Sequence, residues 1–406
     1  MMDLSDYAMV EGHPKYKQAI KREHAIYTRA YDIRTPFVRD YTRLIFSQGY
    51  RRLKNKTQVF FAVDDDHVCT RLEHVNLVSS IANTIARELK LNTELTQAIA
   101  TGHDIGHAPF GHGGERILKD ISQHYHLEPF WHERNSLHFV DDIEVLEDDY
   151  HHFYNLDLTY AVRDGIIAHC GEMQQALITP RDEVIDLQKD FTRTGMFEPY
   201  TYEGCVVKMS DKIAYLARDI EDALRLHIID HNEVNALRDE LNALGGYQFN
   251  AINNGSVVNY FIQDVIHHSS SAGIGLSEEA YRKMHIIMNF NYKHIYLIKR
   301  VDIHNNYVKL MMNSLFEFLY DYYQSPTFLE DLKDDRDQYH TLITHYLAHL
   351  EKHAQFPHIP RNPNYENKVL YDFEHDPQAI TKSILDYLAG MTDTFLIKSF
   401  NELLSF

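Results

Sequence analysis

The chain has 406 residues, of which 59 are acidic and 40 basic, so its net charge is −19. This acidic balance argues against broad, non-specific binding of nucleic acid. Three cysteines without a CxxC pair fit a reduced, cytoplasmic protein, and no apolar run is long enough to predict a membrane span. The N-terminal segment lacks the apolar region of a signal peptide. Sparse Gly (17) and Pro (11) favour helices.

The first predicted helices cover residues 17–31 and 36–54. The end of the second carries a short basic cluster, Arg51, Arg52, Lys54 and Lys56. Such a cluster is usually a solvated helix face, and it matters for function only where the fold brings it near a phosphate.

Residues 70–90 form the clearest amphipathic helix, with His74 extending its apolar stripe by one turn. A second helix is predicted to begin at the N-capping pair Asn92-Thr93 and to end soon after Asp104. The Gly- and Pro-rich residues 105–115 then predict a tight turn that carries further histidines.

The remainder of the chain is also predicted to be helical. A mixed stretch over 134–200 leads to a long helix over 203–227, and a break is expected over 243–256. Ser277 signals the start of another helix, and further helices are expected near 306–324, 337–353 and 377–403. The fold class is therefore all-α, which we divide into regions 1–240 and 241–406.

Most of the 27 histidines have no partnering carboxylate pattern and are interpreted as surface or packing residues. These include His151, His152, His267, His268, His345, His349 and His353. The adjacent pair His103-Asp104, at the end of an apolar helix, is different, because a catalytic metal needs His and carboxylate ligands that converge. His74, 29 residues earlier, is predicted to pack against the same place, although a histidine on a core stripe is more often a hydrogen-bonded core residue.

The helix over 203–227 carries polar residues on two faces beside its apolar stripe. Asp211 lies next to the stripe, and Lys212, Tyr215 and Asp219 follow one another at i, i+3 and i+7. The Asp211 carboxylate is suited to binding a metal ion. The residues Lys212, Tyr215 and Asp219 are suited to binding an anion and a sugar hydroxyl. A surface helix with an ordinary charge pattern is the alternative interpretation.

Several segments, in order, resemble the HD superfamily and, within it, the deoxyguanosine triphosphate triphosphohydrolase family. The resemblance covers about residues 40–225 and fades in the C-terminal part, where NFNYKHIY (289–296) is only vaguely similar. It implies an HD-domain helical core with additional C-terminal helices. Its segments are SQGYRRLKNKTQVF (47–60), RLEH (71–74), HDIGHAPFGHGGE (103–115), FWHE (130–133) and SDKIAYLARDIED (210–222).

By matching position, the resemblance implies that His74, His103, Asp104 and Asp211 are metal ligands. The residues that it places at the α-phosphate are His107, His112, Glu115 and His132. At the triphosphate and the sugar it places Gln58, Arg71, Lys212, Tyr215 and Asp219. Ala108 stands where the family often has a second proline, and Arg218 precedes Asp219 where the family often has histidine. The sugar contact of Asp219 is kept, whereas base preference and oligomer contacts are open to change.

The resemblance implies hydrolysis of a deoxynucleoside triphosphate (dNTP) to deoxynucleoside and tripolyphosphate. His112, backed by Glu115, is the candidate proton donor to the leaving oxygen. The mixed ligand set is compatible with Mn, Mg, Fe, Co, Ni or Zn. A homo-oligomer, tetramer or hexamer, and activation by a nucleotide are further expectations from the resemblance. The alternatives are another HD phosphohydrolase (a 5′-nucleotidase, a phosphodiesterase or a guanosine-tetraphosphate hydrolase) and a regulatory nucleic-acid-binding HD protein.

Overall fold

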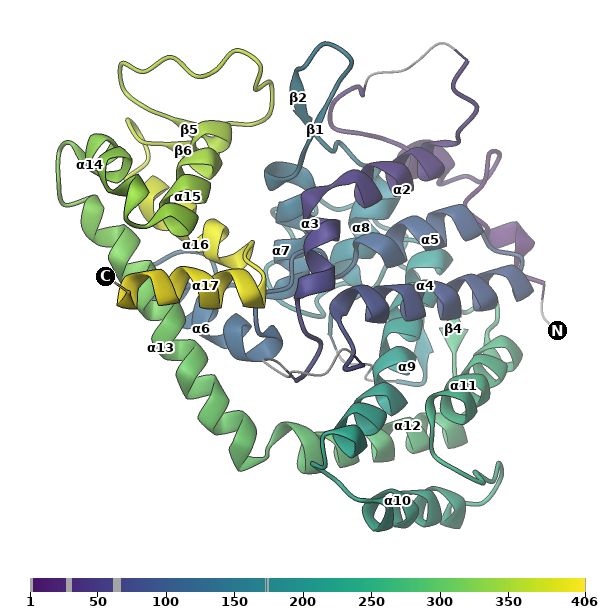
Figure 1. Cartoon of the computed structure of the whole chain (residues 1–406). Coiled ribbons are helices and arrows are strands. Elements are labelled where there is room, and N and C mark those ends of the chain that lie inside the picture. The colour runs from purple at the N-terminus through teal and green to yellow at the C-terminus, as the bar shows by residue number, and fades with distance from the viewer. Residues whose placement is uncertain (1–2, 27–30, 61–66, 172, 174, 406) are drawn as a thin grey trace. The chain divides into compact units, whose positions relative to one another are not determined.

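The computed structural model describes residues 3–26, 31–60, 67–171, 173 and 175–405. The chain forms two compact units that alternate along the sequence. The first unit comprises Met1–Leu44, Asp66–Asp104 and Leu158–Asp302, and the second comprises Ile45–Asp65, Ile105–Asp157 and Ile303–Phe406. Helices dominate both units, so the all-α prediction is confirmed (Figure 1). None of the described helices is long and apolar enough to cross a membrane.

The first unit is built around three helices, α4 (Arg71–Glu88), α5 (Thr93–Gly102) and α9 (Tyr202–Arg225), which pack against one another. The capping box of Thr70 and Glu73 starts α4, and the Asn92 side chain caps α5. The other elements of the unit are η1 (Ser5–Tyr7), α1 (Tyr16–Ala19), α8 (Tyr160–Ala168), β3 (Leu177–Ile178), α10 (His231–Ala243), α11 (Asn254–His268), β4 (Ile274–Gly275), α12 (Glu278–Asn291) and the π-helical turn η4 (Tyr292–Tyr296).

The predicted apolar stripes form the core of this unit. Val78, Ile81 and Ile85 of α4 are buried, as are Val206 and Ile213 of α9. Removing this much apolar surface from water is the main force that holds the three helices together.

The second unit combines helices from three parts of the chain. Its elements are α3 (Gln48–Arg52), η2 (Leu53–Asn55), α6 (Gly111–His124), α7 (His132–His138), the π-helical turn η3 (Phe139–Ile143), β1 (Val145–Glu147), β2 (Phe153–Asn155), α14 (Phe328–Asp334), η5 (Asp335–Asp337), α15 (His340–His353), β5 (Ala354–Gln355), β6 (Tyr371–Asp372), α16 (Ala379–Ala389) and α17 (Asp393–Leu404). Two helices cross the boundary between units, α2 (Pro36–Phe46) and α13 (Lys299–Tyr322). Strand pairs β1–β2 and β3–β4 are antiparallel and β5–β6 is parallel.

Two sequence predictions about helices are wrong. The helix expected over 17–31 is only the short α1, and the described residues that follow it are turns and coil; residues 27–30 lie outside the described part. The turn expected over 105–115 ends at Phe110, because α6 begins at Gly111. The first turn of α6 needs a glycine at position 114 because of close packing. A Cβ atom at Gly114 would lie 1.9 Å from the carbonyl oxygen of Pro109.

Candidate functional site

In the first unit, His74, His103 and Asp104 converge. One potential ligand atom of each lies within 4.8 Å of those of the other two. His74 comes from the first turn of α4, and His103 is the C-cap of α5, so the packing of these two helices brings the imidazoles together. Asp211 of α9 adjoins them, with its Oδ1 3.0 Å from Nε2 of His74 and 3.7 Å from Nε2 of His103.

The His103 ring is held in one orientation by its own helix. Its Nδ1 lies 2.7 Å from the carbonyl oxygen of Ala100, and because that oxygen only accepts, Nδ1 carries the proton. The buried Nε2 is then the lone-pair nitrogen that faces Asp211. Histidines that bind a metal through one ring nitrogen usually donate a hydrogen bond from the other one to a carbonyl or carboxylate oxygen, as His103 does here. The donor set of two imidazoles and two carboxylates therefore fits a divalent metal ion.

Buried charges surround this cluster. Nη1 of Arg71 donates a 2.7 Å hydrogen bond to Oδ2 of Asp104, and both side chains are buried. Burial alone would raise the pKa of Asp211, but the neighbouring imidazoles of His103 and His74 hold it well below its ordinary value. Asp211 is therefore a carboxylate at neutral pH, as a metal ligand must be.

The column Lys212, Tyr215 and Asp219 lies on α9 as predicted, and Lys212 and Asp219 are buried. Burial raises the pKa of Asp219 to about 7, although a hydrogen bond from the Tyr296 hydroxyl lowers it. Tyr296, in η4, was not picked out from the sequence; its only signal was the weakly similar NFNYKHIY segment.

In the second unit, the segment that follows Asp104 packs closely against the middle of α7. A side chain at Gly106 would meet the backbone nitrogen of Ser136 at 2.1 Å, so only glycine permits this approach. The Ser136 hydroxyl accepts a hydrogen bond from the Gly106 amide, and the Asn135 amide donates one to the Gly106 carbonyl. This contact brings the rings of His107 and His132 together, with their centroids 4.0 Å apart.

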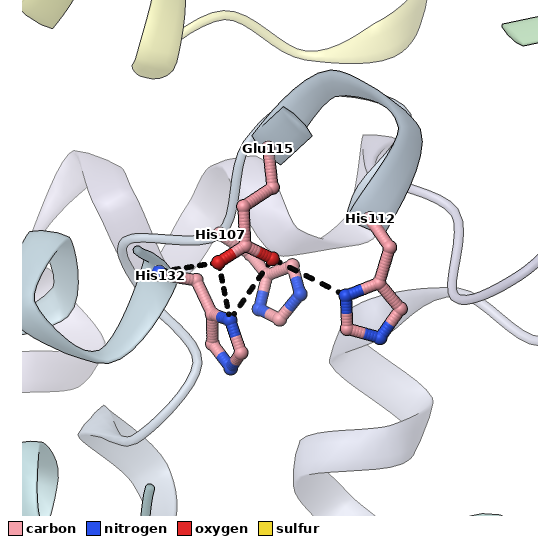
Figure 2. Close-up of side chains that lie close together, drawn as sticks. All are labelled: His107, His112, Glu115 and His132. Carbon is pink, nitrogen blue, oxygen red and sulfur yellow. Dashed lines mark hydrogen bonds and ion pairs between the residues drawn. The ribbon is translucent and has the colours of Figure 1, made fainter. Parts of the chain in front are cut away.

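Three histidines and one carboxylate gather there, as Figure 2 shows. One oxygen of Glu115 accepts a 2.9 Å hydrogen bond from the backbone amide of His132 and lies 3.1 Å from its Nδ1. Its other oxygen lies 3.2 Å from Nδ1 of His112. Burial would raise the pKa of Glu115. The charge of His132, together with the hydrogen bond that Glu115 accepts from His112, instead holds this pKa far below the usual range. The Glu115 carboxylate thus orients two imidazoles, and the His112 side chain is 78% exposed.

Two of the four residues of the basic cluster, Arg52 and Lys56, are used inside the second unit, whereas Arg51 and Lys54 are exposed. Arg52 pairs with Glu144 at 2.5 Å, and the buried Lys56 donates hydrogen bonds to the backbone carbonyls of His107 and Ala389. Next to Gln58, the amide and hydroxyl of Thr57 bond to the Asp393 carboxylate. Lys56 therefore supports the loop that carries His107, and the cluster is not a uniformly exposed basic face.

Comparison with known proteins agrees with these features. Residues 71–216 match the HD domain family model. The chain is 36% identical, over 291 residues, to a deoxyguanosinetriphosphate triphosphohydrolase-like protein of Caldanaerobacter subterraneus subsp. tengcongensis, covering 71% of this chain and 74% of the relative. A protein of the same name from Desulfatibacillum aliphaticivorans is 36% identical over 297 residues (72% and 74%), and one from Clostridium tetani is 28% identical over 382 residues (92% and 86%).

The helical core and the His/Asp cluster thus define an HD-domain phosphohydrolase. Within that class, the chain belongs to the family of deoxyguanosinetriphosphate triphosphohydrolase-like proteins.

Proposed function

We propose that this protein hydrolyses dNTPs to deoxynucleoside and tripolyphosphate, with a divalent metal ion. The observation that carries the proposal is the convergence of His74, His103 and Asp104 in a family whose curated relatives are named for triphosphohydrolase activity. The donor chemistry accepts Mn, Mg, Fe, Co, Ni or Zn.

The proposed metal ligands are His74, His103, Asp104 and Asp211. A metal ion bound there supplies Lewis acidity and lowers the pKa of a water molecule. The chain's own part is to present ligands in the right protonation state: the Ala100 carbonyl fixes the His103 tautomer, and Asp211 is already ionised.

The histidine cluster of the second unit is proposed to act on the α-phosphate. His107 and His132 donate hydrogen bonds to its oxygens, which offsets the charge that builds up as water attacks phosphorus. As the new oxygen–phosphorus bond forms, the bond to the 5′-oxygen breaks, and His112 gives that oxygen a proton. Glu115 holds His112 and His132 in place for these roles. The proposal requires that this cluster and the His/Asp cluster act on one substrate.

The remaining residues are assigned to the rest of the nucleotide. Lys212 and Arg71 hold the triphosphate, since cationic side chains bind phosphate oxygens strongly. Tyr215, Asp219 and Gln58 contact the deoxyribose, Asp219 at the 3′-hydroxyl.

The test is incubation of the full chain with each dNTP, alone and in mixtures, with Mn²⁺ or Mg²⁺, and resolution of the products by ³¹P NMR. Tripolyphosphate is expected, and it should disappear in Asp104→Ala but persist in Asp120→Ala, an exposed aspartate of α6 that serves as the matched control. Pyrophosphate with a nucleoside monophosphate would contradict the proposal and point to another HD hydrolase. Turnover only in mixtures would indicate a nucleotide activator.

The assembly and location of the protein are proposals too. We infer a homo-oligomer, tetramer or hexamer, in the cytoplasm, and light scattering of the purified protein measures its mass directly. A nucleic-acid-binding role is disfavoured, because the net charge is −19 and Arg52 and Lys56 are already engaged by the protein.

A further inference from the structure

The second unit contains a cavity of about 330 Å³ that none of the proposed catalytic residues lines. It lies among α3, η3, α15 and the junction between α16 and α17. Small-molecule sites are commonly about 300–1,000 Å³, apolar in the main, with a few polar groups. Three of the histidines interpreted as ordinary from the sequence, His345, His349 and His353, are part of its wall.

Aromatic rings form part of the apolar wall. Phe139, Tyr387 and Phe395 all line the cavity. Phe139 and Tyr387 are buried, and the His345 ring meets the Phe395 ring edge-on with centroids 5.0 Å apart. Rings held in place in this way offer flat faces on which a planar ligand packs.

The charged side chains of the wall are two of each sign, Arg52 and Lys352 against Glu144 and Asp386. Arg52 is balanced by Glu144, at 2.5 Å, and Asp386 accepts hydrogen bonds from Tyr371 and His138. Lys352, in the last turn of α15, has no ion-pair partner within 4.0 Å among the described residues. Burial lowers the pKa of this ammonium group, and the nearby carboxylates of Glu144 and Glu351 offset that effect only in part.

Two further features suit a polar ligand group. Thr392, the N-cap of the twelve-residue helix α17, lines the cavity, so the positive end of a helix dipole is at its wall. Tyr371 donates its proton to Asp386 and therefore accepts from Nε2 of His349, at 3.0 Å. Since burial lowers the pKa of His349 to about 4, that ring is neutral at pH 7 and its Nδ1 is a hydrogen-bond acceptor.

We propose that this cavity binds a small aromatic anion, a carboxylate or a phosphate monoester, with its ring against Phe139 and Phe395 and its anionic group at Lys352. The site is separate from the proposed catalytic clusters, and it does not depend on the proposed function. An anion forms the direct ion pair that Lys352 does not make with the described residues, and the ring fills the apolar volume.

Isothermal titration calorimetry of the full chain tests this with phenyl phosphate, benzoate and the neutral benzyl alcohol. At least one of the two anions should bind ten times more tightly than the alcohol. Lys352→Met keeps the apolar stem and removes the charge, and it should weaken that anion at least tenfold. The control is Lys333→Met, an exposed lysine in the last turn of α14 that does not line the cavity; it should change nothing. Whichever of the two anions binds more tightly shows whether the anionic group of the natural ligand is a phosphate ester or a carboxylate.

A second variant separates this cavity from the catalytic histidines, to which phenyl phosphate is also attracted. Ala348 is an exposed residue of the cavity wall, so Ala348→Phe should fold normally, fill the space and abolish binding, whereas His132→Ala should leave the cavity's affinity intact. Equal affinity for benzyl alcohol, unchanged binding in Lys352→Met and Ala348→Phe, or no binding of either anion would each overturn the proposal.

Discussion

Arg71 and Asp104 form a buried ion pair, with Nη1 of Arg71 2.7 Å from Oδ2 of Asp104. The guanidinium thus balances a carboxylate that we propose to be a metal ligand. In the absence of metal, removing the arginine leaves a buried charge, which typically costs about 3–5 kcal/mol. Arg71→Gln should therefore lower the unfolding free energy of the metal-free protein strongly, and added Mn²⁺ should raise its melting temperature more than that of the wild type. An identical metal-induced shift in both proteins would contradict this role.

Metal binding itself should be visible without a substrate. A ligand that binds only the folded state at 100 times its Kd stabilises it by about 2.7 kcal/mol. Calorimetric unfolding with Mn²⁺ and then with a chelator should show a rise and a return of the melting temperature. His103→Ala should lose this response, and His375→Ala, an exposed histidine paired with Asp372, should keep it. Retention of the full shift in His103→Ala would exclude His103 as a ligand.

Glu115 is expected to act by positioning His132 and His112. Glu115→Gln keeps the shape but removes the charge, so we expect kcat to fall about 100-fold, a typical value for disturbed acid–base catalysis, with a smaller effect on KM. The matched control is Glu128→Gln, whose carboxylate pairs with Arg134 and is 75% exposed. Steady-state kinetics measures both variants, and equal kcat in Glu115→Gln and wild type would remove Glu115 from the mechanism.

The Tyr296–Asp219 contact predicts a pH-dependent KM. Burial raises the pKa of Asp219 to about 7 and the Tyr296 hydroxyl lowers it, so Tyr296→Phe should raise it further. If ionised Asp219 accepts the 3′-hydroxyl, the variant will be more protonated at pH 7, and its KM will be several-fold higher there. At pH 9 the two KM values should converge. A KM defect that is the same at every pH would mean that Tyr296 acts through packing alone.

Glu203 gives a prediction about stability that is independent of the proposed site. Burial raises its pKa from 4.5 to about 7, although its Oε1 accepts hydrogen bonds from the amides of Met9 and Asn92. Because the folded-state pKa is the higher one, this contribution to stability is complete below pH 4.5 and is lost as the pH rises through 7. The loss is about 3 kcal/mol, since one pKa unit corresponds to about 1.4 kcal/mol.

The variant Glu203→Gln keeps the Oε1 acceptor and cannot ionise. Its unfolding free energy, relative to wild type, should therefore increase by about 3 kcal/mol between pH 4 and pH 8. Denaturant unfolding at a series of pH values measures this difference. A constant difference over that range would show that Glu203 keeps an ordinary pKa.

The sequence by itself determined the helical class, the helices around residues 70–90, 92–104 and 203–227, and the family. These follow from local signals, namely apolar periodicity, caps such as Thr70 and Asn92, and motifs in order, which act over a few residues of chain. Over residues 20–26 the structure has turns and coil where a helix was expected, because a short segment does not form a stable helix from propensity alone.

Only the tertiary structure decided which side chains meet. The Tyr296–Asp219 bond joins residues 77 positions apart, and Asp211 reaches His74 across 137 positions. It also decided that Arg52 and Lys56 serve the interior of the second unit, and that Lys352 lines a cavity. Charge and residue type are visible in the sequence, but burial and partners depend on packing between distant segments, and these determine whether a histidine, lysine or carboxylate is structural or functional.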